Sequence, residues 1–360
     1  MPTLLTAKNG KPDLKGLTEG EFLELAEDLG LSPYRGRQLA RWVFVRGSRS
    51  FDEMTDLPKD LRPRLAESCT ITHLVPETCQ ASRDGIRKFI FRTSAGHPFE
   101  SVLIPDSGRL TLCLSVQAGC RMGCAFCATG TLGLLEQLKT ASIVDQYLAA
   151  RRAAPEARVT NLVFMGMGEP LDNYEEVARA LRILTHPAWL AVPPRRITVS
   201  TCGLVPAMTR FKAEFPQVRL AVSLGAPDDE RRNRLIPVNK KYPLAVLLDA
   251  CRQINLPPRQ RITFEYCLLS SVNDSPEDAS RLGELLKGIR CKVNLIPFNE
   301  SPELPYQRPE AAVVNRFAAL LSKVGMTVTV RESRGRDIDA ACGQLAGKFS
   351  PGPNSPPGFH

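Results

Sequence analysis

The stretch GCRMGCAFCATG, residues 119–130, holds three cysteines in the spacing C-x3-C-x2-C. Cys120, Cys124 and Cys127 follow residues 110–116, whose sequence LTLCLSV predicts a β-strand. Three thiolates on one short loop can hold a metal ion or a metal cluster. Because structural metal sites in proteins usually have four ligands, the triplet leaves one position open.

An iron–sulfur cluster explains this triplet better than zinc does. A structural zinc site needs a fourth ligand, which Cys113 could supply, and zinc sites usually combine two separated Cys or His pairs. The sequence has no second pair, and its four histidines are solitary. A four-iron cluster with three cysteine ligands keeps one iron open for the amino and carboxylate groups of a small molecule. The spacing, with Phe126 directly before Cys127, resembles the signature of the radical S-adenosylmethionine (SAM) enzymes.

Downstream of the triplet, predicted strands alternate with predicted helices. Strands are predicted at 159–166, 195–201, 218–224, 261–269, 291–298 and 326–332, and helices at 137–152, 173–184, 204–214, 244–253, 276–287 and 309–323. This alternation predicts a parallel α/β sheet, either a partial barrel or a doubly wound sheet. In both folds the functional groups gather at the carboxyl ends of the strands.

Upstream of the triplet, the pattern changes twice. Residues 14–70 are helical in character and rich in arginine, whereas residues 86–92 and 99–105 predict a hairpin. The helical part could bind RNA or cover an edge of the sheet. We divide the chain into a helical accessory domain (1–75), a β extension (76–105), a core (106–348) and a tail (349–360). The tail is rich in Pro, Gly and Ser and is expected to be disordered.

Composition narrows the class of partner. The chain has 360 residues, eleven cysteines and a formal net charge of +9, which suits a polyanion such as RNA, although a merely basic enzyme has the same balance. No apolar run is long enough for a membrane span and the N-terminus lacks the order of a signal peptide, so we expect a cytoplasmic protein. In that compartment clustered cysteines favour metal or redox chemistry over structural disulfides.

Polar residues recur where successive predicted strands end. Glycine lets backbone approach a ligand closely, and a glutamate can accept from an ammonium group, as Gly168 and Glu169 of GMGEP could do. Ser200, Ser223 and Asn299 end later strands, and side chains in such places can converge on one ligand. The GMGEP stretch also resembles the GGE-type motif of radical SAM enzymes.

The segment RESRGRDIDAACGQLAG, residues 331–347, places Cys342 after a basic, glycine-containing turn. A lone cysteine is usually a small buried apolar residue. The basic and small neighbours favour instead a reactive thiol that faces an anionic substrate.

Together these motifs resemble the RlmN/Cfr family of radical SAM RNA methyltransferases. The resemblance rests on FESVLIP, LTLCLSVQAGCRMGCAFCATG, GMGEPLDN, STCGLVP, SLGAPDDERRNRLIPVNKKYPL, NLIPFN and RGRDIDAACGQLAG, and it runs from about Leu17 to Lys348. It implies a partial (β/α)6 barrel with a small N-terminal helical domain, in which YRGRQLARWVF matches the accessory domain of the family. It further implies methylation of C2 of an adenosine in ribosomal RNA and in the tRNA anticodon loop.

The resemblance also implies roles for residues. Cys120, Cys124 and Cys127 would hold a [4Fe–4S] cluster, and Cys342 would carry the methyl group. Gly168, Glu169, Ser200, Ser223, Leu224, Gly225 and Asn299 would line SAM. Glu100 would be the proton acceptor, and Cys113 would form a transient disulfide with Cys342.

Chemistry explains why a methyl-carrying thiol is needed. C2 of adenine is electron-poor and has no nucleophilic lone pair, so direct displacement at the SAM methyl group is unfavourable. A thiolate is a good nucleophile and can take the methyl group first, from one SAM. A second SAM, cleaved by the reduced cluster, would give the radical that removes a hydrogen atom from that methyl group. A base must then remove the C2 proton, and a second thiol must displace the sulfur.

Three alternatives remain open. A Cfr-like enzyme that methylates C8 shares almost all of these motifs, and a zinc-stabilised RNA-binding module would explain the charge and the triplet without catalysis. The third is a radical SAM enzyme with a substrate other than RNA, against which the basic termini and the stretch RESRGR argue. Many relatives have His where this chain has Gly225, which is harmless if the contact there is made by backbone. The remaining cysteines are expected to be inert packing thiols or partly exposed thiols. The resemblance implies two SAM molecules per turnover and a flavodoxin-type electron donor, and we expect no oligomer.

Overall fold

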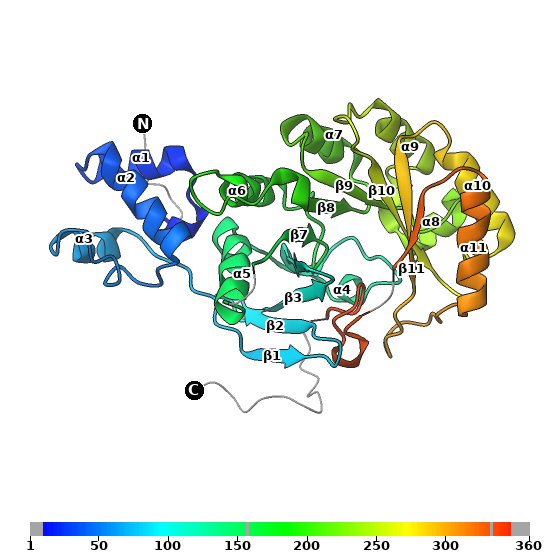
Figure 1. Cartoon of the computed structure of the whole chain (residues 1–360), viewed down its shortest axis with the longest axis horizontal. Coiled ribbons are helices and arrows are strands. Elements are labelled where there is room, and N and C mark those ends of the chain that lie inside the picture. The colour runs from blue at the N-terminus through cyan, green and yellow to red at the C-terminus, as the bar shows by residue number, and fades with distance from the viewer. Residues whose placement is uncertain (1–9, 156–157, 332–333, 347–360) are drawn as a thin grey trace.

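The computed structural model describes residues 10–155, 158–331 and 334–346 (Figure 1). The strands are β1 (Thr78–Ala81), β2 (Arg87–Arg92), β3 (Pro98–Asp106), β4 (Arg109–Cys113), β5 (Gln117–Cys120), β6 (Gly133–Gln137), β7 (Asn161–Phe164), β8 (Ile197–Thr201), β9 (Arg219–Ser223), β10 (Ile262–Leu268), β11 (Cys291–Pro297) and β12 (Val328–Val330). The helices are α1 (Glu19–Asp28), α2 (Pro33–Ala40), α3 (Leu61–Ser68), α4 (Ala128–Thr131), α5 (Thr140–Ala153), α6 (Tyr174–Thr185), α7 (Val205–Glu214), α8 (Asp229–Leu235), α9 (Leu244–Gln253), α10 (Pro276–Leu286) and α11 (Ala311–Lys323). Within the described part of the chain, no helix has both the length and the apolar character needed to cross a membrane.

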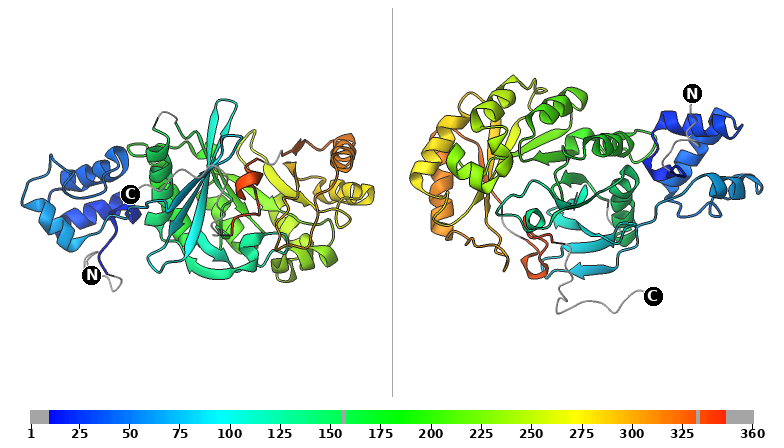
Figure 2. Two further views of the ribbon diagram at one scale, coloured as in Figure 1. Left: turned by 90° about the horizontal axis from the view of Figure 1, so that it is seen from below. Right: turned by 180° about the vertical axis from the view of Figure 1, so that it is seen from behind.

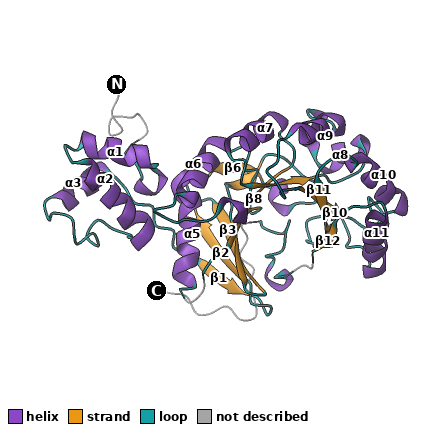
Figure 3. Cartoon of the chain, turned by 45° about the horizontal axis from the view of Figure 1, so that its top comes forward, coloured by secondary structure: helices purple, strands orange, loops and turns teal. Residues whose placement is uncertain are grey.

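One sheet of ten strands organises the core, in the order β1-β2-β3-β4-β7-β8-β9-β10-β11-β12. From β4 through β12 neighbouring strands are parallel and follow chain order, whereas β1 to β4 pair antiparallel. A doubly wound sheet would reverse its strand order, so sequential order means that the sheet curls in one direction, as in a barrel. Figure 3 shows the helices arching along the outside of this curved sheet. The expected partial barrel is confirmed.

The parallel strands form where apolar residues alternate along the sequence, so that one face of each strand is buried. In β10, for example, Ile262, Phe264 and Tyr266 lie on one face and are fully buried, and β8 and β11 alternate buried and half-buried residues in the same way. The predicted hairpin is β2 with β3. The prediction for residues 110–116 was too long, because β4 ends at Cys113. Beyond it, the backbone N–H groups of Leu114 and Val116 donate to carbonyls at and beyond the end of β7.

Helices α1 to α3 lie at one end of the molecule, beside α5 and α6 (Figures 1 and 2). The Lys15 ammonium donates to the Asp145 carboxylate of α5 at 2.6 Å, and both side chains are fully buried. Arg179 of α6 makes two 2.8 Å hydrogen bonds to Glu21 of α1. These contacts fix the helical end to the core. The predicted domain boundaries stay predictions, and the predicted disorder of 349–360 lies outside the described residues.

Replacing Asp145 with alanine is expected to lower the free energy of unfolding by about 3–5 kcal/mol. The substitution leaves the Lys15 ammonium buried without its carboxylate, and it removes the acceptor of the Leu74 backbone N–H. Urea unfolding followed by circular dichroism measures the change. The control is Glu175→Ala, which breaks a pair with Arg210 whose side chains are both more than half exposed and should cost at most about 1 kcal/mol. Equal effects of the two substitutions would contradict the prediction.

Candidate active site

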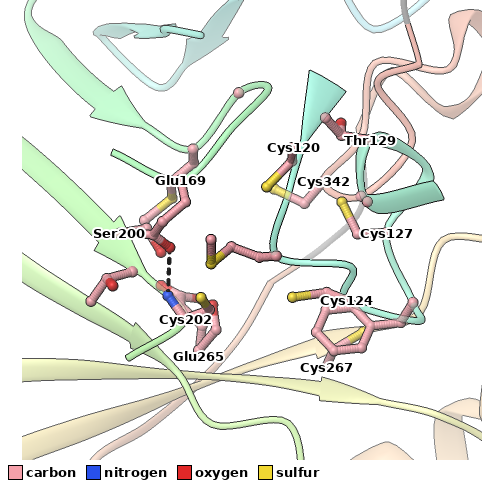
Figure 4. A pocket seen from close by; sticks show the side chains of 18 of the residues that line it. Cys120, Cys124, Cys127, Thr129, Glu169, Ser200, Cys202, Glu265, Cys267 and Cys342 are labelled. Carbon is pink, nitrogen blue, oxygen red and sulfur yellow. Dashed lines mark hydrogen bonds between the residues drawn. The ribbon is translucent and has the colours of Figure 1, made fainter. Parts of the chain in front are cut away.

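A cavity of about 180 Å³ opens at the carboxyl ends of the parallel strands. Its walls come from the cysteine loop, from the ends of β7 to β11, and from the C-terminal segment (Figure 4). This is the place where α/β folds with parallel strands gather functional groups. The cavity therefore brings together residues that are far apart in the sequence.

The cysteine triplet lies along one wall of this cavity. Cys120 ends β5, and Cys127 directly precedes α4, so the loop between them is held at both ends by regular structure. Figure 4 shows the three thiols spread around the same side of the cavity. Among the described residues no set of three His, Cys, Asp or Glu side chains is grouped to hold a single metal ion. Three separate thiols that face one space fit a cluster, in which each thiolate binds a different iron.

The zinc alternative needed Cys113 as the fourth ligand. Cys113 instead ends β4 and lines a second, smaller cavity that contains none of the triplet. Every cysteine in the structure is a free thiol. The cysteine loop itself supplies three thiols to the main cavity, which agrees with a cluster that keeps one iron open, and the thiols of Cys202, Cys267 and Cys342 line other parts of the same cavity.

The wall opposite the triplet carries four of the predicted SAM contacts, namely Gly168, Glu169, Ser200 and Ser223. Gly168 has φ of +97°, and a side chain there would come within 2.5 Å of Gln117, so only glycine fits. Glu169 accepts the backbone N–H groups of Cys202 at 2.8 Å and Leu171 at 3.0 Å. Burial raises the pKa of Glu169, and these hydrogen bonds oppose the shift. Its carboxyl oxygens have capacity for a further donor from a ligand.

The other three predicted SAM contacts do not line the main cavity. Leu224 and Gly225 are buried. Gly225 has φ of +75°, a side chain there would meet Ile236 at 2.7 Å, and its carbonyl accepts from Asn273. Glycine thus suits the local backbone, in place of the His of relatives. Asn299 lines the second cavity, and all three contacts stay predictions.

Cys342 lies on the walls of both cavities. Its carbonyl accepts from Asn299 at 3.0 Å, and the next carbonyl, of Gly343, accepts from the backbone N–H of Ala128 at 2.8 Å. The hydroxyl of Thr129 donates to Leu345. The segment that carries Cys342 is therefore bonded directly to the turn that begins after the third cysteine of the triplet.

The second cavity, of about 60 Å³, puts Cys113 and Cys342 on one wall together with Arg331. The pKa of the Cys113 thiol is raised to about 12, first by burial and then by Cys342, while Arg331 acts to lower it. The pKa of Arg331 is in turn raised, first by Cys342 and then by Glu265 and Cys113, against the effect of burial. The guanidinium thus lies where negative charge on either thiol is stabilised.

Glu100 lies on β3 and is buried. It lines neither cavity, but Val102, two residues further along the same face, lines the second cavity and pairs with Cys113 across the sheet. Glu100 and Cys113 are therefore diagonal neighbours on one face. The carboxylate of Glu100 is paired with the ammonium of Lys88 at 3.5 Å.

The sequence reasoning missed several residues of the main cavity. Cys202 and Cys267 were expected to be packing thiols, yet both line it, and a hydrogen bond with Cys124 helps to raise the pKa of Cys202. Glu265 accepts from Asn294 at 2.6 Å, and Arg331 reaches both cavities. The signal available was position, since Cys202 directly follows β8 and Glu265 and Cys267 lie near the carboxyl end of β10.

Comparison with protein families agrees with this architecture. Residues 114–282 match the Radical SAM superfamily, and residues 12–71 match the ribosomal RNA large subunit methyltransferase N-terminal domain. A crystal structure of a radical SAM methyltransferase from Sphaerobacter thermophilus superposes with a TM-score of 0.90 and 45% sequence identity, covering 94% of this chain and 100% of that one.

Curated relatives carry the name dual-specificity RNA methyltransferase RlmN. The protein of Geobacter sulfurreducens is 52% identical over 337 residues, which cover 94% of this chain and 92% of that protein. The protein of Anaeromyxobacter dehalogenans is 49% identical over 348 residues, 95% and 93% of the two chains. Likeness of this degree over nearly the whole length, with the triplet, the strand-end residues and Cys342 around one cavity, establishes that the chain belongs to the RlmN family of radical SAM methyltransferases.

Proposed function

We propose that the protein methylates C2 of an adenosine in ribosomal RNA and in the tRNA anticodon loop, with Cys342 as the methyl carrier. The observation that carries this proposal is the place of Cys342 between two cavities. One cavity holds the triplet and the predicted SAM contacts, and the other holds Cys113. A carrier that must take a methyl group on one side and be released by a second thiol on the other needs this position.

The chain uses a [4Fe–4S] cluster and SAM, as its family does. Cys120, Cys124 and Cys127 would hold the cluster, and Gly168, Glu169, Ser200 and Ser223 would orient SAM against it. When bound, these groups supply the methyl group and the one-electron chemistry that activates it. Glu169, held by two backbone N–H groups, presents its carboxylate to the ammonium end of such a ligand.

The thiols and the carboxylate divide the remaining work. Cys342 attacks the methyl group as a thiolate, and Arg331 lies on the walls of the same two cavities. Glu100 takes the proton from C2 once the methylene carbon is joined to the ring. Cys113 then attacks the sulfur of Cys342 as a thiolate, so that a disulfide forms as the sulfur–carbon bond breaks, and the electron pair of that bond passes to the carbon, which takes up a proton to become the methyl group. The one electron left over from the radical addition would be accepted by the cluster. That disulfide is transient, and both thiols are free in the structure.

The N-terminal helices supply the second part of the proposal. They belong to a region that matches a domain named for the methylation of large-subunit ribosomal RNA, and the segment between α2 and α3 carries exposed arginines such as Arg41 and Arg49. We assign them RNA contacts, since phosphate binding needs clustered positive charge. The cytoplasm is the compartment where both RNA substrates and a flavodoxin-type electron donor would be met.

Mass spectrometry of nucleosides tests the function. The protein is reconstituted without oxygen with iron, sulfide, SAM and a reductant, and then offered unmodified ribosomal RNA and tRNA separately. We expect about four iron and four sulfide per chain, and 2-methyladenosine from both RNAs. An 8-methyladenosine product would instead assign the Cfr-like reaction, which the shared motifs leave as the second candidate. Zinc without sulfide would overturn the catalytic reading altogether.

A further inference from the structure

Lys88 and Glu100 form an ion pair in the interior of the protein. The Lys88 Nζ lies 3.5 Å from the Glu100 Oε2, and the side chains are only 2% and 1% exposed. In the β2–β3 ladder Lys88 stands opposite Val102, and Glu100 stands opposite Ile90. The two charged residues are therefore diagonal neighbours, and their side chains leave the sheet on the same face.

That face of the sheet is the one that borders the second cavity. Val102 and Ile104 continue the Glu100 side of β3 and line the second cavity, where Cys113 and Cys342 also lie. Ser101, on the opposite side of the strand, bonds instead to Gln146 of α5. A buried ion pair is seldom worth more to stability than two well-packed apolar residues would be. Its position beside the two reactive thiols suggests work other than holding the fold.

The Lys88 ammonium has a second contact, with the C-terminal segment. It makes a long hydrogen bond of 3.5 Å to the carbonyl of Asp339, three residues before Cys342. The same segment is fastened to the β1–β2 turn, where Asp84 accepts from the backbone N–H of Gly335 at 2.9 Å and Ser82 bonds to Asp337. One ammonium therefore touches both the proposed base and the backbone that leads to the methyl carrier.

We propose that Lys88 is a positioning residue for the proton-transfer step, holding Glu100 as an aimed carboxylate and tying it to the segment that carries Cys342. The inference rests on the proposed function, in which Glu100 removes the C2 proton. In that step the C2–H bond breaks, its electron pair stays with the adenine ring, and the proton moves to a carboxylate oxygen of Glu100. Lys88 is not itself a proton donor or acceptor in this step, and its ammonium fixes the place of the carboxylate through their 3.5 Å contact.

The test compares Lys88→Met, Lys88→Arg, Glu100→Gln and the double variant Lys88→Met/Glu100→Gln. Three quantities are measured for each: 5′-deoxyadenosine released, 2-methyladenosine formed, and RNA covalently joined to protein. For Lys88→Met we expect 5′-deoxyadenosine within about twofold of the starting protein, product reduced by about tenfold or more, and an RNA–protein adduct that accumulates as in Glu100→Gln. Lys88→Arg, which keeps the positive charge, should recover most of the product.

The double variant separates positioning from a second, independent role. If Lys88 acts through Glu100, the double variant is no slower than Glu100→Gln alone, because residues that act as a unit are not additive. In the double variant both substituted side chains are uncharged, so no unpaired charge is left in the interior. Should Lys88→Met fail to fold, Lys88→Gln, which retains a donor but no charge, carries the same expectation.

Three results would overturn the inference. The first is formation of 2-methyladenosine by Lys88→Met at the rate of the starting protein. The second is a double variant whose loss of product equals the product of the losses in the two single variants. The third is a uniform loss of 5′-deoxyadenosine and product together with a lower unfolding temperature, which would mean a purely structural pair. Failure of the proposed function has a different signature, since the unaltered protein would then form no 2-methyladenosine and Glu100→Gln would trap no adduct.

Discussion

Replacement of Cys342 by alanine is expected to abolish methyladenosine formation on both RNAs. Adenine C2 offers no lone pair to a methyl donor, so without a thiol to carry the methyl group there is no second route to the product. We expect a loss of at least about 1,000-fold, measured as 2-methyladenosine per chain by mass spectrometry. The iron and sulfide content should not change, because Cys342 is not one of the three thiols assigned to the cluster.

The matched control is Cys267→Ala, since Cys267 lines the same cavity as Cys342 and has no assigned step. Intact-protein mass spectrometry adds a direct readout. One methyl group should be found on the starting protein and on Cys267→Ala, and none on Cys342→Ala. Methyladenosine from Cys342→Ala at a rate near that of the control would remove Cys342 from the reaction.

Replacement of Cys113 by alanine is expected to trap the protein on its RNA. The methyl carbon can still join the adenine ring, but no second thiol lies on the wall of the small cavity to displace the Cys342 sulfur. A covalent RNA–protein species should therefore accumulate up to one per chain, with free methylated RNA reduced by about 100-fold or more. Gel electrophoresis under denaturing conditions, before and after nuclease treatment, measures the fraction trapped.

Cys291→Ala serves as the control for that experiment. Cys291 is a buried thiol at the amino end of β11, whereas the cavities lie at the carboxyl ends of the parallel strands. It should release methylated RNA like the starting protein. The double variant Cys113→Ala/Cys342→Ala should trap nothing, since the adduct requires the carrier. If Cys113→Ala turned over normally, the resolving thiol would have to be sought among the other cysteines that face Cys342, with Cys267 first.

The parallel part of the sheet was predictable because each predicted strand from 110–116 to 291–298 was followed along the chain by a predicted helix of ordinary length. Several short elements were not predictable from the sequence. Strands β5 and β6 and helix α8 were missed, and α8, with the sequence DERRNRL, has one apolar residue and no visible periodicity. The helix is stabilised by contacts with residues outside it. For example, the buried guanidinium of Arg232 donates hydrogen bonds to the carbonyls of Leu224 and Cys202. Tertiary contacts of that kind leave no mark on a local pattern.

In the site, the triplet and Cys342 were predictable from spacing and from the resemblance, but the surroundings were not. Whether a residue near the end of a strand faces the cavity depends on the register, and a shift of one residue reverses the face. The sequence therefore does not tell whether thiols such as Cys202 and Cys267 face the cavity or the packed interior. Lys88 could not be singled out either, since a lysine in a predicted strand is ordinarily an exposed residue.

The buried Lys15–Asp145 pair and the Arg179–Glu21 fork have a consequence for substrate choice. They tie the helical end to the barrel, so the span from this end to Cys342 is set within one folded unit. If the helical end binds RNA as proposed, an RNA that contacts both places must present its adenosine at that one separation from the backbone phosphates that the helical end binds. Two RNAs of unrelated sequence can then both be substrates if their folded shapes agree over that span. An adenosine in a different three-dimensional setting is then not methylated, even where its neighbouring bases are the same.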